Sequence, residues 1–490
     1  MAPAAFQSHP LVYEINTRCW LRDLSEQAGA PITLANVPET ELADWRRLGF
    51  THIWLMGVWH AGPKSRAHSL SLRQPGQPLQ RYDEQDIVGS AYAIASYRVS
   101  EALGGNTALK VFRERLAAFG LKLLLDFVPN HTGLDHAWLA ERPELFVQSG
   151  VKKPGTFRPS ANKACWIAHG RDPYFHPWVD TAQLDYRNAA TRRAMIEQLK
   201  SVAQRCDGAR CDMSMLVLND VFQKTWAQFP VSLPCPATQF WAEAIPAVKE
   251  LYPDFTFMAE VYWDLEPRLQ ELGFDYTYDK RWHDHLVARR PDPLQRHLLE
   301  AAAGDLRAGV HFLENHDEAR IASFLPWAEH RPAALALMGS PGMRLLHEGQ
   351  LRGATQRVSI HVNHRPREAP NEDIAAFYER LLGTLPGTSV GKGDFKVLKP
   401  ASAWPENPTA RNILLVQWQS QPAEFDLVVA NFAPHPSQCH APLQVEGQCD
   451  WEMTNLLGDE RFERSGRDLR RGLYLDLPPY GSQLFHFSVR

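Results

Sequence analysis

The sequence is poor in cysteine, and its cysteines form no pattern. It has seven in 490 residues, none of them in a Cys-x-x-Cys pair, which argues against a disulfide framework and against a zinc site. No apolar run is long enough to span a membrane. The first residues, MAPAAFQSHP, lack the basic segment and apolar core of a secretory signal. We therefore expect a cytoplasmic protein with no membrane partner.

A strong charge of either sign is also missing. The formal net charge is −4, with 22% charged and 44% hydrophobic residues, a composition typical of folded proteins that argues against a nucleic-acid partner. No GxGxxG motif follows an early strand, which weakens the case for a dinucleotide-binding fold. A chain of 490 residues exceeds what one compact core usually holds, so we expect two or three domains.

What the sequence does contain is an alternation of short apolar runs with amphipathic helical patterns. Continuous apolar runs are typical of parallel strands covered on both faces. Eight such strands with intervening helices predict an α/β fold, a (β/α)8 TIM barrel, and a doubly wound open sheet is the alternative. The predicted strands are 11–16, 51–59, 121–129, 208–213, 256–263, 273–278, 310–315 and 342–347.

Three helices can be placed from their apolar stripes and their caps. In residues 106–120, Thr107 is a candidate N-cap and Gly120 a candidate stop. Residues 36–49 and 188–205 show the same periodicity. These segments are predicted to be helices of the barrel.

Two parts of the chain depart from this alternation and predict the domain organisation. Residues 132–180 are irregular and rich in proline, glycine and aromatics, which indicates an inserted domain after the third strand. Beyond residue 391 the pattern changes to short β-type runs, typical of a C-terminal antiparallel β-sandwich domain, 391–490. The catalytic barrel is then predicted to comprise 1–131 and 181–390.

Acidic side chains stand at or near the ends of four predicted strands. Active sites of (β/α)8 barrels lie at the C-terminal ends of the strands, and residues two apart on a strand share a face. Each acid taken alone could be a helix cap, a turn residue or a surface acid. Their joint placement beside apolar residues favours convergence on one pocket. The acids are Asp126, Asp212, Glu260 and Asp317.

The motifs around these acids are DFVPNH, GARCD, EVYW and FLENHDEAR. In order and spacing they resemble the four conserved regions of glycoside hydrolase family 13, the α-amylase family. The end of the chain, LDLPPYGSQLF, is similar to the last strands of that family's C-terminal domain. The resemblance implies that Asp212 is the nucleophile, Glu260 the general acid/base and Asp317 a third carboxylate that stabilises the transition state. Substrate-binding roles are expected for Tyr92, Asp126, His131, Arg210, Tyr262, His316 and Arg320.

The chemistry implied is a double displacement through a covalent glycosyl-enzyme, in which one carboxyl attacks and the other protonates the leaving oxygen. The two groups need different protonation states. Arg210 beside Asp212 predicts an ionised nucleophile, since an opposite charge favours the charged form. Apolar neighbours of Glu260, among them Met258, Val261 and Trp263, predict a protonated acid.

Some positions depart from the family pattern. Met215 and Leu216 stand where many endo-acting amylases place Lys-His, and Ala93 and Ser96 replace two acids. These departures favour a short α-linked glucoside over long starch.

A calcium ion is possible but not favoured. Asn130 matches a calcium ligand of the family, but Asp172 is the only acid between residues 151 and 179, and calcium prefers several carboxylate oxygens. We therefore predict no cofactor and no metal site.

Two segments on the predicted catalytic face are basic. Residues 60–82 and 349–370 carry these cations, with Glu368 as the only acid: Lys64, Arg66, Arg73, Arg81, Arg352, Arg357, Arg365 and Arg367. An anionic substrate such as a phosphorylated or carboxylated sugar is one interpretation. A solvated loop surface is the more common reason for such charges.

Three functions remain open at this point. The first is a retaining α-glycoside hydrolase whose partner is an α-glucan or a small α-glucoside. The second is a transglycosylase or sugar isomerase, glucanotransferase-like or trehalose synthase-like, on the same site. The third is a non-catalytic carbohydrate-binding relative, which the presence of all three carboxylates disfavours. The sequence leaves the oligomeric state open.

Overall fold

A computed structural model describes residues 9–160, 163–231, 235–445 and 449–490. Eight parallel strands close into a barrel in the order β1-β15-β14-β13-β12-β11-β5-β2. Seven of these strands lie within the predicted segments and β14 begins one residue before its own, so the (β/α)8 barrel is confirmed. The strands are β1 (Leu11–Asn16), β2 (His52–Met56), β5 (Lys122–Phe127), β11 (Gly208–Cys211), β12 (Thr256–Ala259), β13 (Tyr276–Tyr278), β14 (Gly309–Phe312) and β15 (Met343–His347).

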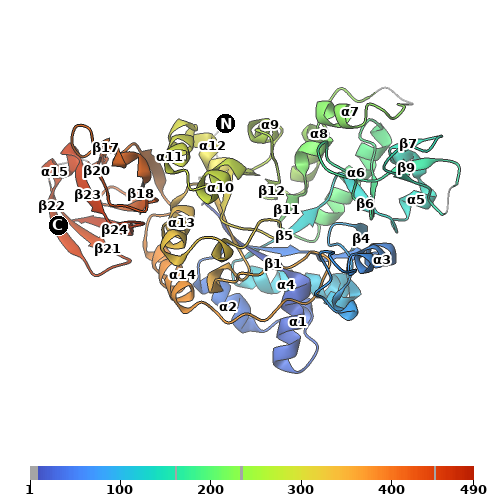
Figure 1. Ribbon diagram of the computed structural model, residues 1–490, viewed down its shortest axis with the longest axis horizontal. Helices are drawn as coiled ribbons and strands as arrows, with labels where there is room; N and C mark the ends of the chain where they lie inside the picture. The colour runs from blue at the N-terminus through green and yellow to red at the C-terminus, as the bar shows by residue number, and fades with distance from the viewer. Residues whose placement is uncertain (1–8, 161–162, 232–234, 446–448) are drawn as a thin grey trace.

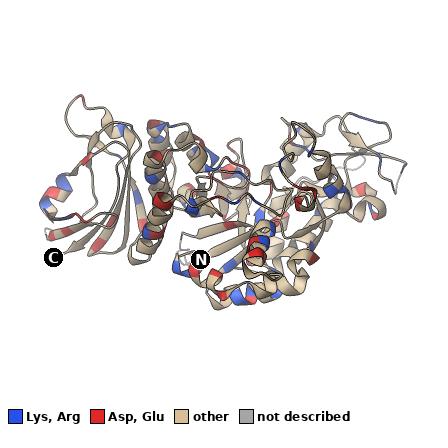
Figure 2. Cartoon of the chain, turned by 60° about the horizontal axis from the view of Figure 1, so that its bottom comes forward, with Lys and Arg blue, Asp and Glu red and all other residues tan. Residues whose placement is uncertain are grey.

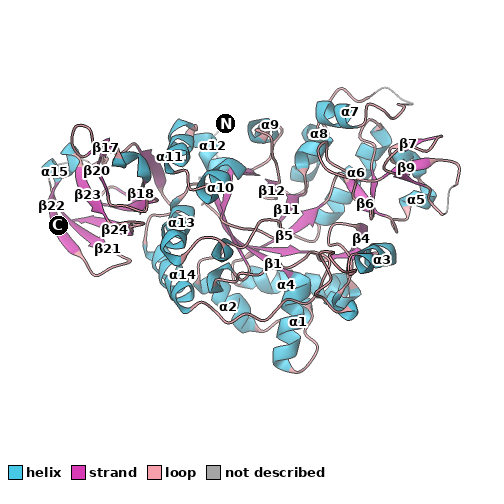
Figure 3. Ribbon diagram, in the orientation of Figure 1, coloured by secondary structure: helices cyan, strands magenta, loops and turns pink. Residues whose placement is uncertain are grey.

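Helices surround this barrel (Figure 3). Their apolar faces pack on the outward-pointing residues of the strands, whose central positions are fully buried. The helices of the barrel are α1 (Thr17–Ala28), α2 (Glu39–Arg47), α3 (Pro63–Ser71), α4 (Gly105–Ala118), α6 (Ala189–Ala203), α7 (Asn219–Thr225), α8 (Phe240–Lys249), α9 (Glu266–Glu271), α10 (Lys280–Val287), α11 (Pro291–Glu300), α12 (Ala303–Ala308), α13 (Trp327–Gly339) and α14 (Glu372–Thr384).

The predicted helix caps are right in part. Asn188 caps α6, since its side chain accepts from the N–H of Ala190. Thr107 does not cap α4, which begins two residues earlier, after Gly104. Gly104 has a φ of 97°, a left-handed conformation that turns the chain into the helix without a side-chain cap. Helix α2 starts only at Glu39, after Pro38.

The predicted insertion contains short elements of its own. The antiparallel pair β6 (His131–Gly133) and β10 (Thr181–Gln183) joins its two ends to each other. Arg171 donates to the carbonyl of Thr225, 2.9 Å away, and so holds the insertion against the segment that follows β11. Between the two ends lie α5 (Trp138–Glu141), β7 (Gln148–Ser149), β8 (Thr156–Phe157) and β9 (Trp166–Ala168), of which the three strands form one sheet.

The end of the chain forms a domain of two antiparallel sheets at the side of the barrel opposite the insertion (Figure 1). Leu415, Phe425 and Phe487 belong to a separate apolar core of this domain. The larger sheet consists of β16 (Asp394–Leu398), β18 (Ile413–Gln421), β19 (Glu424–Asn431), β24 (Ser482–Val489), β21 (Asp450–Asn455) and β22 (Arg461–Ser465). The smaller one consists of β17 (Ala401–Ser402), β20 (Ser437–Ala441) and β23 (Leu473–Leu477), and α15 (Gly466–Arg471) leads into β23. A C-terminal β domain is thereby confirmed.

The predicted domain limits remain predictions. Parts of the predicted ranges, namely 1–8, 161–162, 232–234 and 446–448, lie outside the described residues. Within the described ones, residues 131–133 pair with 181–183 beside the predicted junctions, and β16 begins three residues after 391.

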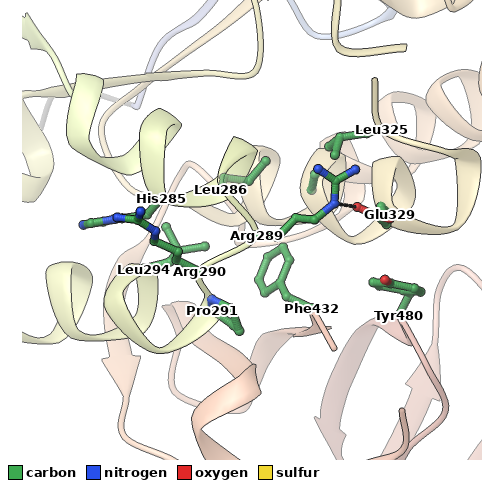
Figure 4. A pocket seen from close by; sticks show the side chains of 11 residues that line it. His285, Leu286, Arg289, Arg290, Pro291, Leu294, Leu325, Glu329, Phe432 and Tyr480 are labelled. Carbon is green, nitrogen blue, oxygen red and sulfur yellow. Dashed lines mark hydrogen bonds and ion pairs between the residues drawn. The ribbon is translucent and has the colours of Figure 1, made fainter. Parts of the chain in front are cut away.

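The barrel and the C-terminal domain pack tightly against each other. The second face of the large sheet covers α13, and Trp418 donates its indole N–H to the carbonyl of Gly339, 2.9 Å away. At the edge of this interface, Arg289 pairs with Glu329 beside Phe432 and Tyr480 (Figure 4).

A glycine at this interface gives a stability prediction. A Cβ on Gly339 would lie 2.6 Å from Val428 Cγ1 in β19. We expect Gly339→Ala to lower the free energy of unfolding by about 1–3 kcal/mol, the usual cost of overpacking. Gly383 in α14 meets nothing within 4 Å, so Gly383→Ala should raise it by about 0.5–1 kcal/mol. Urea denaturation measures the free energy of unfolding of both variants. An equal change in the two would contradict the close contact between Gly339 and Val428.

Two expectations about the surface can be compared with the structure. Among the described residues, no helix is long and apolar enough to cross a membrane. Positively and negatively charged residues are interspersed along the helices (Figure 2), in keeping with the small net charge.

Candidate active site

Three carboxylates lie just beyond the C-terminal ends of barrel strands. Asp212 follows β11 directly, Glu260 follows β12 directly, and Asp317 lies five residues after β14. Asp212 and Glu260 are 7% and 3% exposed, whereas the side chain of Asp317 is 44% exposed. Because parallel strands of a barrel end at one rim, strands far apart in the sequence bring these acids together.

Arg210 connects two of the three. Its Nη1 lies 2.8 Å from Asp212 Oδ1, and its Nη2 lies 2.8 Å from Glu260 Oε2. Asp126, its direct neighbour on β5, lies farther away at 3.5 Å. The arginine is fully buried, and its charge is compensated by these carboxylates, whose contact raises the pKa of Arg210 despite its burial.

Aromatic rings enclose the guanidinium of Arg210. Its carbon lies 5.2 Å from the ring centre of Trp54, 5.4 Å from that of Tyr92 and 5.9 Å from that of Tyr278. Cations are attracted to ring faces at such distances, more so where water is excluded. Neither Trp54 nor Tyr278 was among the predicted site residues.

The charge of Asp212 differs from the sequence prediction. Burial and the neighbouring Glu260 raise the pKa of Asp212 to about 7, and Arg210 only partly opposes this rise. Arg210 lowers the pKa of Asp212, as expected from the sequence, but burial and Glu260 outweigh this effect, so the net shift is upward and opposite to the expectation. Asp126 behaves in the same way, since burial raises its pKa to about 6 against the effect of Arg210.

Glu260 does not lie in the apolar environment expected from its neighbours. Besides Arg210, its Oε2 accepts from the backbone N–H of Met213 at 2.7 Å. Its Oε1 accepts from the hydroxyl of Tyr262 at 2.8 Å. Tyr262 therefore touches the predicted acid itself, and three donors fix the position of this carboxyl.

Asp317 is linked to a buried histidine and a second acid. His316 Nε2 lies 3.0 Å from Asp317 Oδ2, and its Nδ1 lies 2.5 Å from Glu14 Oε1. Burial opposes ionisation of the ring, but the two carboxylates raise the pKa of His316 well above its usual value. Although the side chain of Asp317 is partly exposed, the surrounding protein opposes its ionisation, and His316 outweighs this effect and lowers the pKa of Asp317 below its usual value.

Sequence reasoning missed Glu14, although a signal was present. It is an acid in the apolar strand LVYEIN, it is fully buried, and the period of two places it on one face with Val12 and Asn16. Tyr92 joins this group from a different direction: its hydroxyl lies 2.8 Å from His316 Nε2, and the two rings stack 5.3 Å apart.

His131 lies beside the site and Arg320 in another network. His131 hydrogen-bonds the backbone of Tyr92 and has its ring centre 5.2 Å from that of Trp178, and burial lowers its pKa to about 4. Arg320 instead donates to Glu314 at 2.6 Å and to the carbonyl of Glu348 at 2.7 Å. The contacts of this arginine are with Glu314 and the segment after β15, not with Asp212, Glu260 or Asp317.

Comparison with known proteins agrees with this geometry. Residues 41–380, more than half of the chain, match the family described as alpha amylase, catalytic domain. The chain belongs to the α-amylase family. It is 22% identical over 373 residues to Alpha-amylase MalA of Haloarcula japonica, a match that covers 74% of this chain and 51% of that protein.

Two further relatives show the range within the α-amylase family. Alpha-1,4-glucan:maltose-1-phosphate maltosyltransferase of Rhodospirillum rubrum is 27% identical over 256 residues, 48% of this chain and 30% of that protein. The chain thus spans about half or less of the length of these curated relatives. The maltogenic alpha-amylase AmyB of Thermotoga neapolitana has the same fold, with a TM-score of 0.68 and 18% identity over 98% of this chain and 99% of that one.

The segment after Asp212 lacks the Lys-His of many family members, and the structure shows what replaces it. Met215 and Leu216 lie in a short 3-10 helix, Ser214–Val217, where both side chains are buried. They pack into the core and offer no polar group to a substrate. Met213 has a φ of 41°, a left-handed conformation that is uncommon for a non-glycine residue, and its N–H contacts Glu260.

The basic segments are largely occupied by local contacts. Arg365 binds Asp23 and Glu348, the latter at 2.7 Å, and Arg367 binds Glu26 at 2.9 Å. These contacts favour the solvated or structural interpretation for both side chains. Only two of the predicted cations concern the site: Arg357 lies 3.4 Å from Asp317, and Arg81 donates to the carbonyl of Arg357.

At the position where the family can hold calcium, the side chains of this protein contact other protein groups. Gln183 donates to the side-chain oxygen of Asn130 at 3.0 Å, and the carboxylate of Asp172 accepts from two backbone N–H groups. In the part of the chain that the structure describes, no three His, Cys, Asp or Glu side chains are arranged to hold a metal. The absence of calcium stays a prediction.

Proposed function

We propose that the protein is a retaining α-glycoside hydrolase acting on short α-linked glucosides. The observation that carries the proposal is the single guanidinium of Arg210 in contact with both Asp212 and Glu260. A retaining glycosidase needs two carboxyls roughly 5–5.5 Å apart, and two carboxyls on one guanidinium are compatible with that separation. Asp317 at the same rim supplies the third acid.

The reaction would proceed in two displacements. Ionised Asp212 attacks the anomeric carbon, while Glu260 gives its proton to the leaving oxygen, so the glycosidic bond breaks as the glycosyl ester forms. Glu260 then takes a proton from water, which attacks the same carbon and releases Asp212. Asp317, paired with His316, would bind sugar hydroxyls and stabilise positive charge on the ring in both transition states.

The preference for a short substrate rests on the leaving-group side of the site. Many family members grip the next sugar with Lys-His, whereas Met215 and Leu216 are buried here. The second candidate function is transfer to a sugar acceptor, which uses the same first displacement. The name of the maltosyltransferase to which the chain is similar is the observation that favours it.

A substrate screen tests the proposal. Maltooligosaccharides, other α-linked disaccharides, trehalose and sucrose would be offered with and without an added sugar acceptor, and the products separated by chromatography. We expect release of glucose or maltose from short α-glucosides. A longer product that appears only with the acceptor would identify transfer, and no turnover of any α-glucoside would contradict both functions.

The pH profile is expected to reflect the raised pKa of Asp212. The attacking carboxylate must be ionised, and its pKa is about 7 because of burial and Glu260. Hence the acid limb of kcat/KM, which reports the ionisation of the Asp212 and Glu260 pair in the free enzyme, should lie well above the pH at which an ordinary aspartate titrates. Circular dichroism over the same range would control for unfolding. An acid limb centred near pH 4, typical of an ordinary aspartate, would contradict this assignment.

An anionic substrate, the less favoured interpretation of the basic segments, has one test residue in the structure. Arg357 contacts Asp317, whereas Arg365 is held between Asp23 and Glu348. We expect Arg357→Ala to lower kcat/KM equally for neutral maltosides and for a phosphorylated glucoside if the arginine only orients Asp317. A selective loss on the phosphorylated substrate would instead support recognition of an anion.

A further inference from the structure

Glu14 is a fully buried carboxyl that the proposed reaction does not use. It lies on β1 in register with Trp54 of β2 and His347 of β15, so the three side chains share one face of the barrel sheet. Its Oε1 lies 2.5 Å from Nδ1 of His316, while its Oε2 has no hydrogen-bond partner among the described residues. A charge buried in this way needs a compensating charge, and the contact with His316 shows where it comes from.

Both ring nitrogens of His316 face carboxylates. Nδ1 faces Glu14, and Nε2 lies 3.0 Å from Oδ2 of Asp317 and 2.8 Å from the hydroxyl of Tyr92, which can accept from the same N–H. A neutral imidazole carries one proton, so one of its nitrogens would turn a lone pair towards a carboxylate. With both carboxylates ionised, both contacts are favourable only when the ring is the doubly protonated cation, which donates to each side.

The charge of the His316 ring depends on two acids. The titratable or charged side chains that face this residue from the elements around it are Glu14, Tyr92, Asp126, Asp317, His347 and Arg357. Of the described residues, only Glu14 and Asp317 form ion pairs with the ring. His347 Nδ1 lies 2.8 Å from Nη1 of Arg320, which can only donate, so this nitrogen carries no proton. Burial and Arg320 lower the pKa of His347 to about 3, and its ring is therefore neutral.

We propose that Glu14 is a positioning residue, which keeps His316 doubly protonated so that its Nε2–H holds Asp317 in place for the sugar. Without a negative charge at position 14, the ring would lose a proton at lower pH and turn the lone pair of Nε2 towards Asp317. The side chain of Asp317 is 44% exposed and is free to swing away once this donor is lost. The inference rests on the proposed function, in which Asp317 binds sugar hydroxyls, and it adds a residue that lies outside all four motifs.

An NMR titration of the His316 ring tests the charge directly. In protein labelled with 15N-histidine, the ring signals of His316 are those that disappear in His316→Gln. We expect a doubly protonated ring in the wild type up to about pH 8, and a pKa lower by about 1–2 units in Glu14→Gln, which keeps an oxygen near Nδ1 but removes the charge. Glu14→Asp keeps the charge and should restore most of the shift. Glu41, a half-buried acid that accepts from Trp20, provides the control, since Glu41→Gln should leave the titration of His316 unchanged.

Kinetics on a short α-glucoside show whether this charge matters to turnover. The ratio of kcat/KM at pH 8 to kcat/KM at pH 6 should be about tenfold lower in Glu14→Gln than in the wild type, since one pKa unit corresponds to a factor of ten. An equal fall at both pH values would mean that Glu14 only supports the fold, and would overturn the inference. A wild-type His316 that titrates near its ordinary pKa of about 6.5, or a titration that Glu14→Gln leaves unchanged, would overturn it as well. If the wild type cleaves no α-glucoside, the proposed function fails, and the NMR titration still decides whether Glu14 keeps the ring charged.

Discussion

Asp212→Asn is expected to reduce kcat on the best α-glucoside by roughly 10⁴-fold or more, the size of effect seen when the nucleophile of a catalytic group is removed. The amide cannot attack the anomeric carbon, although its oxygen can still accept from Arg210. Initial-rate kinetics and calorimetric binding of the substrate would be measured together. Binding should persist while turnover is lost.

Asp212→Asn should keep or gain stability although it loses activity. The pKa of Asp212 is raised in the folded protein, so the contribution of this group to stability is present at low pH and is lost as the pH rises through about 7. Asp212→Asn should therefore unfold at the same or a higher urea concentration than wild type at pH 8. Asp220→Asn, on the exposed ion pair with Arg268, is the matched control with near-normal activity. Full activity of Asp212→Asn would show that Asp212 is not the nucleophile.

Arg210→Met is expected to lower the free energy of unfolding by about 3–5 kcal/mol at neutral pH, because it leaves buried carboxylates without their partner. Asp212 and Glu260 both lose a contact of 2.8 Å, and Asp126 loses its longer one. Without the cation, the pKa values of Asp212 and Asp126 rise further in the folded state. The loss of stability should accordingly be larger at pH 8 than at pH 5.

Urea denaturation at both pH values measures this effect. Arg98 is exposed, and Arg98→Met should change stability by no more than about 0.5 kcal/mol. Arg210→Lys keeps the charge but has only one nitrogen, which cannot reproduce two contacts on separate carboxylates. We expect it to be more stable than Arg210→Met and still poorly active. A loss of stability independent of pH would point to packing rather than to charge.

The barrel could be predicted from the sequence because its signal is repeated. Eight apolar runs alternate with helical stripes, and each coincides with or overlaps a barrel strand. The start of α4 was missed because two adjacent glycines, Gly104 and Gly105, both adopt positive φ and replace the side-chain cap expected at Thr107. Such a start depends on backbone conformation, which has no periodic signature in the sequence.

The sequence predicted the positions of the three acids at the barrel rim but not their charges or all of their neighbours. The motifs place Asp212, Glu260 and Asp317 at the barrel rim, where the structure has them. No motif shows that one guanidinium contacts both Asp212 and Glu260. Nor does a motif show that burial and Glu260 together raise the pKa of Asp212. Motif position likewise did not show that Arg320 points into the network of Glu314 and Glu348.

The anomeric configuration of the first product tests the central claim most directly. Proton NMR would follow the cleavage of a short α-linked maltooligosaccharide before mutarotation equilibrates the anomers. Two displacements through Asp212 predict that the α-anomer of the newly formed reducing end appears first. The β-anomer as first product would mean a single displacement by water, and would contradict the retaining mechanism.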